Sequence, residues 1–422
     1  MTVPRNHHYV PQSLLRQFAV PSGRKIKQVY VYSKEQHRSF LSSVVNAGAE
    51  RDFYSVDIGT SQVNWEPAFQ RLDDRLAEVL LALTNCNSLI QIDVSIRADI
   101  PLLVATQMLR TQMLRTSVTD LVAQLNEIGE PLGVEQIDFS DNDTRRIHLK
   151  RLLEIQKVAE LFAGKDILLL QSTENKALWI SDNPVVCHNT FPYGSVGICS
   201  LGVEMYFPIS STRCLALYCP GIGEQIRESL DPEHLRPMLS NPFYQKLLRG
   251  IDNGTLVAIS DDFISFLNEL QIRQSSRFLY SSNSDFSLAE LVLDANPSLE
   301  RVTSLSKLGE FGAAPPPLQG MPAGTFLLLE RGYRHDILSV VDCSDQVGRG
   351  NIAVTIIDEL KFSSIDTANI FDSATLIVDG YAMQMMREVL LTRGVEGEED
   401  VLAVTYADSS LQAMMESMVI AQ

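Results

Sequence analysis

The chain has 422 residues, 45% hydrophobic and 21% charged, which is enough to bury the cores of two or three domains. Its net charge of −17 argues against general, charge-driven binding to nucleic acid or membranes. The apolar runs are too short to cross a bilayer, and the polar first residues do not resemble a signal peptide. Six cysteines without a C-x-x-C pair predict reduced thiols, no zinc site and a cytoplasmic location.

The charge is unevenly distributed along the chain. Residues 1–38 carry seven basic side chains and one acidic side chain, a net charge of +6. Residues 301–422 carry eight basic and seventeen acidic side chains, a net charge of −9. This asymmetry predicts that the two ends meet different partners.

Hydrophobic periodicity predicts an α+β fold, with a mainly helical N-terminal body and a small mixed or antiparallel sheet. Amphipathic helices are expected at 65–83, 99–116, 144–162, 241–248 and 261–279. Short β-branched and aromatic runs predict strands at 29–32, 165–171, 177–180, 204–209 and 215–219.

A Pro/Gly-rich stretch at 312–324 is typical of a stiff linker between two domains. It separates an N-terminal domain, 1–311, from an acidic C-terminal domain, 325–422. In the second domain we expect a small α+β fold, with strands at 325–330, 337–341, 352–357 and 374–378 and helices at 381–391 and 409–418.

The opening NHHYVPQ, residues 6–12, predicts a stiff extended segment before a short helix. Pro11 fixes its own φ and disfavours helical geometry at Val10. Neighbouring side chains of an extended chain point to opposite faces, so His7 and His8 cannot both reach one site. The favoured interpretation is a histidine that satisfies a buried hydrogen bond. The alternative is a histidine that faces a pocket and titrates near neutral pH.

Gln107 and Arg110 share one face of the helix expected at 99–116, which is otherwise rich in Leu, Met, Ala and Val. A guanidinium buried there needs an anionic partner. We favour an internal ion pair with Asp182 or Asp52 over a bound phosphate, although the planar fork of arginine fits both.

The run Ser181-Asp182-Asn183-Pro184 follows an expected strand and predicts a tight turn. Asp and Asn side chains often bond to their own backbone in such turns. Alternatively, Asp182 projects from the strand end into a cleft, where catalytic carboxylates often lie.

Several nucleotide and metal motifs are absent from the sequence. It has no Walker A loop, no G-x-G-x-x-G, no H-E-x-x-H and no G-x-S-x-G. ATP-binding, NAD-binding and zinc-protease functions therefore have no support. No metal site is predicted, and the cofactor is left unknown.

Five stretches follow the motif order of family 4238 of the domains of unknown function. They are NHHYVPQSLLRQF at the start, NAGAERDFY near residue 50, the QMLRT helix, LWISDNPV, and FLYSSN at 278–283. The chain resembles this family over residues 5–285, and the HHYVPQ opening combined with the SDNP turn is its most specific signal. The resemblance implies a bacterial accessory protein of uncharacterised activity, and some members are similar to antiphage defence proteins. It also favours as site residues those that lie in the motifs, which are His7, His8, Asp52, Gln107, Arg110, Asp182 and Asn183.

The first functional hypothesis is a hydrolase that binds a phosphodiester of RNA or DNA at the N-terminal lobe. His7 or His8 would be the general acid or base, and Arg110 would stabilise charge in the transition state. Asp182 would orient the histidine or activate water. Gln107, Asn183 and Asp52 would contribute to substrate binding.

The second hypothesis is a non-catalytic sensor or protein-interaction module. The same motifs would then be structural, and the acidic C-terminal domain would dock a protein partner. The two hypotheses differ in whether the motif residues converge on an open cleft or satisfy one another internally.

Overall fold

The computed structural model describes the chain from Arg5 to Ser304 with gaps, and four strands beyond residue 324. The described ranges of the first part are 5–21, 25–58, 61–132, 135–172, 176–189, 198, 203–218 and 242–304. Helices and several small sheets alternate along it, which confirms the α+β prediction.

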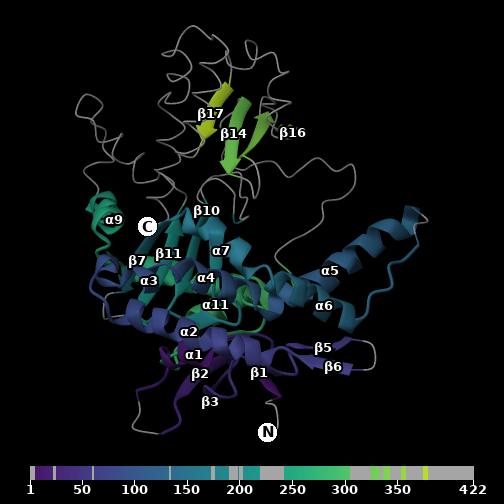
Figure 1. Ribbon diagram of the computed structural model, residues 1–422, viewed down its shortest axis with the longest axis horizontal. Coiled ribbons are helices and arrows are strands. Elements are labelled where there is room, and N and C mark those ends of the chain that lie inside the picture. The colour runs from purple at the N-terminus through teal and green to yellow at the C-terminus, as the bar shows by residue number, and fades with distance from the viewer. Residues whose placement is uncertain are drawn as a thin grey trace.

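A five-stranded sheet forms the centre of the N-terminal body (Figure 1). Its order is β12 (Val257–Ile259), β7 (Asp166–Ser172), β11 (Arg213–Tyr218), β10 (Val203–Pro208) and β9 (Val186–Asn189). All pairs are antiparallel except β12 with β7. Both faces are buried, because the strands are apolar at consecutive positions such as Leu168 and Leu169.

The sheet separates two hydrophobic cores. One face carries Leu169 and Phe207 and packs with α1 (Gln12–Arg16), α2 (Glu66–Asn85), α4 (Ile100–Leu109) and α7 (Ile155–Ala163). The opposite face carries Leu168 and packs with α9 (Pro242–Asn253) and α10 (Asp261–Gln274).

A four-stranded antiparallel sheet joins the start and the end of the N-terminal body. Its order is β3 (Arg38–Ser43), β2 (Gln28–Ser33), β13 (Phe278–Ser281) and β8 (Ile180–Ser181). The helix α11 (Ser287–Ala295) packs on Tyr32 and Leu279 of this sheet. The expected strand at 29–32 is confirmed. The helix expected at 261–279 is too long, because Ser275 is extended and the chain continues into β13.

Two of the expected helices are broken. The 99–116 prediction is wrong, because α4 ends at Leu109 and α5 (Gln112–Gly129) starts after an extended Thr111 whose hydroxyl caps Leu114 N–H. The 144–162 prediction divides into α6 (Asp141–Leu152) and α7. Periodicity alone does not reveal these breaks, because the apolar pattern continues through both.

A helical arm made of α5 and α6 projects from one side of the body (Figure 1). The hairpin of β5 (Ser55–Ile58) and β6 (Ser61–Asn64) lies near α6. The short strand β1 (Asn6–His8) pairs with β4 (Ala49–Arg51). The remaining short helices are α3 (Val94–Arg97) and 3₁₀ turns at 89–91, 130–132 and 297–299.

The C-terminal strands form a separate four-stranded sheet. Its order is β16 (Ala353–Ile357), β15 (Asp336–Asp342), β14 (Thr325–Arg331) and β17 (Ala374–Val378), with β14 parallel to β17. All four predicted strands are present. The predicted linker at 312–324 and helices at 381–391 and 409–418 lie outside the described residues, so the domain division remains a prediction. Among the described residues, no helix is long and apolar enough to cross a membrane.

Candidate functional site

His7 is held in the interior by the backbone that follows β4. Its side chain is fully buried, and its Nδ1 accepts the N–H of Tyr54 at 3.0 Å. The imidazole also stacks on the Tyr54 ring, with 5.8 Å between centroids, and its Nε2 lies 3.4 Å from Asn64 Nδ2. His7 therefore satisfies a buried hydrogen bond, as the favoured interpretation predicts.

His8 is also buried, on the opposite side of β1. Its Nε2 makes no hydrogen bond among the described residues. Burial lowers the pKa of His8, and the charge of Arg110 lowers it further. A lowered pKa favours the neutral imidazole, which supplies no positive charge to bind an anionic substrate.

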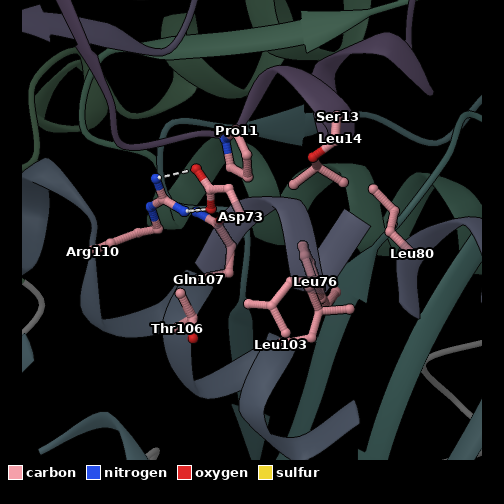
Figure 2. Close-up of a pocket in the computed structure, with 11 residues that line it drawn as sticks. Pro11, Ser13, Leu14, Asp73, Leu76, Leu80, Leu103, Thr106, Gln107 and Arg110 are labelled. Atoms are coloured by element: carbon pink, nitrogen blue, oxygen red, sulfur yellow. Dashed lines mark hydrogen bonds and ion pairs between the residues drawn. The ribbon is translucent and has the colours of Figure 1, made fainter. Parts of the chain in front are cut away.

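Arg110 lies between α4 and α5, where the helix break aims its guanidinium at α2. It forms a bidentate ion pair with Asp73 of α2, as Figure 2 shows. Its Nη2 also donates to the carbonyl of His8, and its Nε donates to the Tyr54 hydroxyl at 3.1 Å. Four of its five N–H groups are thus used inside the protein, and the residue is 1% exposed.

The internal ion pair expected for Arg110 exists, but the expected partner is wrong. Burial would lower the pKa of Arg110, and the adjacent Asp73 carboxylate more than offsets this, so the pKa is raised. Asp73 was missed by the sequence reasoning. A signal was available, because Asp73 lies on the helix face that also carries Phe69 and Leu76.

Gln107 is buried one turn before Arg110. Its Nε2 donates to the carbonyl of Tyr9 at 2.9 Å. Gln107 therefore fixes the NHHYVPQ segment to α4, as Arg110 does through the carbonyl of His8. Two adjacent carbonyls of the opening motif, those of His8 and Tyr9, thus accept hydrogen bonds from side chains of the QMLRT segment.

Asp182 lies at the end of β8 and accepts three backbone hydrogen bonds. Its carboxylate oxygens take the N–H groups of Ser276, Arg277 and Phe278 at 2.7, 2.7 and 2.9 Å. Asp182 is 1% exposed, so it does not project into a cleft. Burial raises its pKa, although the three N–H donors and Lys34 favour the ionised form. Its partners thus belong to the turn before β13, not to Arg110.

Asn183 and Asp52 also have local partners. The amide of Asn183 donates to the carbonyl of Gln274 at 2.9 Å. Asp52 lies nearer the surface, where it pairs with Arg5 at 2.6 Å. Asp52 has a positive φ of 55°, in the region that Asp tolerates better than most residues. Asp52 therefore shapes a turn and makes an ion pair there.

A small cavity lies beside Arg110 (Figure 2). Its lining comes from α1, α2, α4 and β10 and includes Leu14, Asp73, Thr106 and Arg110. Its volume is about 10 Å³, which is room for about one water molecule. A nucleotide needs a pocket of several hundred Å³.

A comparison with known protein families identifies the family of this chain. The family described as "Protein of unknown function (DUF4238)" matches residues 6–285, which is most of the N-terminal body. The chain belongs to this family. No curated protein and no solved structure matches the chain.

Six of the seven predicted residues of the DUF4238 segment lie in two groups, and Asp52 pairs separately with Arg5. His7, His8, Gln107 and Arg110 surround Tyr54 and the NHHYVPQ segment. Asp182 and Asn183 instead hold the junction of α10 and β13. Among the described residues, no group of three or more His, Cys, Asp or Glu side chains could hold a metal ion.

The DUF4238 segment also contains a polar row that the sequence reasoning missed. His188 of β9 pairs across the sheet with Glu204 of β10, and Nδ1 lies 3.6 Å from Oε2. Glu204 is buried and accepts the Tyr206 hydroxyl at 2.6 Å, and Tyr206 meets the Tyr218 hydroxyl at 3.2 Å. The signal was a glutamate in the apolar strand VEMYFP, because a buried acid in a strand needs partners.

Proposed function

We propose that the DUF4238 segment is a non-catalytic binding module whose motifs hold the fold together. The observation that supports this is that Asp73, His8 and Tyr54 occupy four of the five N–H groups of Arg110, a residue that is 1% exposed. A phosphate could reach this guanidinium only if the ion pair with Asp73 opened. Asp73 is partly exposed, but Arg110 is not, and leaving a buried charge without its partner costs about 3–5 kcal/mol.

Phosphodiester hydrolysis by His7, His8, Arg110 and Asp182 fits this arrangement poorly. A general acid or base must come within hydrogen-bond reach of its substrate. Both histidines are buried, and the adjacent cavity admits about one water molecule. We also propose a cytoplasmic location, which the cysteines predict, and an antiphage role, which the family resemblance predicts. The acidic C-terminal domain is proposed to bind a protein partner.

The proposal is tested with the full chain and labelled RNA and DNA in the presence of magnesium or manganese. We expect the nucleic acids to stay intact. Cleavage that disappears in His8→Gln, while the melting temperature is unchanged, would overturn the proposal.

The structural role of the motifs is tested with Asp182→Asn. The amide would turn N–H groups toward backbone donors, so we expect the free energy of unfolding to fall by about 2–4 kcal/mol. Asp52→Asn is the matched control, because it makes the same change at an ion pair nearer the surface, and its loss should be much smaller. If the protein restricts phage, plating efficiency should follow the amount of folded Asp182→Asn protein. Equal free energies of unfolding for Asp182→Asn and Asp52→Asn would contradict the structural role of Asp182.

A hydrolase centred on His188 is the second candidate function. His188 is one-third exposed, and the buried Glu204 lies beside its Nδ1. A carboxylate beside an imidazole is the pair that positions the histidine in many hydrolases, although at 3.6 Å the two groups here are in contact without a hydrogen bond. The other described histidine with a carboxylate partner, His37, pairs with an exposed Glu300. Cleavage lost in His188→Ala but retained in His8→Gln would favour this candidate over the binding module.

A further inference from the structure

The strand β3 is an exposed edge of the four-stranded sheet. β2 covers one side of it, and among the described residues no strand pairs with its other side. Phe40 and Leu41 of β3 are 38% and 40% exposed and point to opposite faces. Natural edge strands are usually protected by proline, lysine or inward-pointing charge. β3 has a single charged residue, Arg38, and no proline.

The hairpin that contains β3, residues 25–45, is basic and partly apolar; we call it the basic hairpin. It carries four basic residues and one acidic residue, a net charge of +3. Lys25, Lys27 and Arg38 are exposed, whereas Glu35 is paired with Arg277. Ile26 and Val45 add exposed aliphatic surface near the end opposite the turn. This surface fits an acidic partner with apolar side chains.

The part of the α5–α6 arm around the connection between its two helices has the complementary properties. We call residues 120–143 the acidic arm; they exclude the basic residues nearer the body, such as Arg115, Arg145 and Arg146. They include seven acidic side chains and no lysine or arginine. Five carboxylates are exposed on the described part of the arm, those of Glu127, Glu130, Glu135, Asp138 and Asp141, and Asp141 pairs with Arg145. Leu121 and Leu125 lie one turn apart on α5, and both are exposed, as is Ile137.

Hydrogen bonds within the arm fix its conformation. The side chain of Asn126 on α5 bonds both the N–H and the carbonyl of Ile137, at 2.7 and 3.1 Å. A capping box of Ser140 and Asp143 starts α6. Holding the acidic and apolar side chains in place reduces the conformational entropy lost when a partner binds.

We propose that the acidic arm of one copy docks on the basic hairpin and β3 edge of a second copy. Both surfaces combine exposed aliphatic side chains with charge, and the signs of the charges are opposite. In Figure 1 the arm projects from the right side of the body, whereas β3 lies at the bottom left of the body. The arm of one molecule is therefore directed away from its own basic hairpin. The contact is heterologous, and it builds rings or open chains.

The proposal is tested by measuring the molar mass of the full chain in solution. By light scattering after gel filtration, we expect self-association that grows with protein concentration and weakens with salt. The double variants Lys25→Glu/Lys27→Glu and Glu127→Lys/Glu130→Lys should each raise the dissociation constant of self-association about tenfold or more. A chain that carries all four substitutions should associate again, because the charges are exchanged between the two surfaces.

Asp74→Lys/Glu78→Lys is the matched control, because it reverses two exposed carboxylates of α2 outside both surfaces. It should associate as the unchanged protein does. A chain that stays monomeric at every concentration overturns the proposal. Association that is equally weakened in the control, or that the four-substitution chain fails to regain, also overturns it. Circular dichroism checks that each variant is folded. The nucleic-acid assay for the binding module does not depend on these outcomes.

Discussion

Glu66 shows how burial changes the chemistry of one side chain in this protein. It lies in the first turn of α2, and its Oε2 is buried without a hydrogen bond among the described residues. Burial raises the pKa of Glu66 from 4.5 to about 7, although the charge of Arg110 opposes the shift. Its folded form therefore binds a proton more tightly than the unfolded chain does. The contribution of Glu66 to stability must then fall as pH rises from 4.5 to 7.

Glu66→Gln should remove this pH dependence. The amide is neutral at every pH, so we expect the variant to gain about 1–2 kcal/mol over the unchanged protein at pH 8. The gain should be much smaller at pH 5, where the folded protein already carries a protonated Glu66. Chemical denaturation at both pH values measures it. An equal difference at pH 5 and pH 8 would show that desolvation of the charge is not the cause.

Gly48 lies where the NAGAERDFY motif contacts the opening segment. Its φ is +61°, in the left-handed region that favours glycine. Its carbonyl accepts the N–H groups of Tyr9 and Val10, both at 3.0 Å. A Cβ at this position would lie 2.7 Å from Val10 Cβ. Two motifs that are distant in the sequence are thus in contact at a position where only glycine fits.

Gly48→Ala should lower the free energy of unfolding by about 2 kcal/mol or more, because it adds both backbone strain and a clash. Gly164→Ala is the matched control, since Gly164 ends α7 with a φ of −86° that alanine adopts readily. Urea denaturation of both variants compares them. A loss for Gly48→Ala no larger than that of the control would contradict the close contact.

The helix α10 connects the two large sheets of the N-terminal body. Three side chains along one of its faces, Asn268, Gln271 and Gln274, bond the segment 177–187. Gln271 accepts the Ser181 hydroxyl at 2.6 Å and donates to the carbonyl of Pro184 at 2.9 Å. Because this segment contributes β8 to one sheet and β9 to the other, both sheets depend on the same helix.

Gln271→Leu should lower the free energy of unfolding by about 2–3 kcal/mol, because it leaves the Pro184 carbonyl buried without its donor. Tryptophan fluorescence and circular dichroism of the N-terminal body should still report one coincident transition. Glu269→Gln, on the outer side of the same helix, should change stability little. Two separate transitions in the unchanged protein would show that the sheets unfold independently.

Local patterns in the sequence were sufficient for many elements of the fold. Alternating β-branched and aromatic residues predicted β2, and apolar spacing predicted α2, because these patterns follow the geometry of a single segment. The same reasoning missed β3 and β13. β3 is exposed along most of its length, and β13 depends on pairing with β2 from the opposite end of the body.

The sequence alone indicated that Arg110 is buried and needs an anionic partner, but it did not reveal Asp73 or the polar row of His188 and Glu204. The three-dimensional fold shows that this anion is Asp73, that Asp182 binds the backbone of residues 276–278, and that the cavity beside Arg110 has room for about one water molecule. The physical reason is that the partner of a buried charge is fixed by contacts between segments far apart in the chain. Spacing along the sequence does not contain that information.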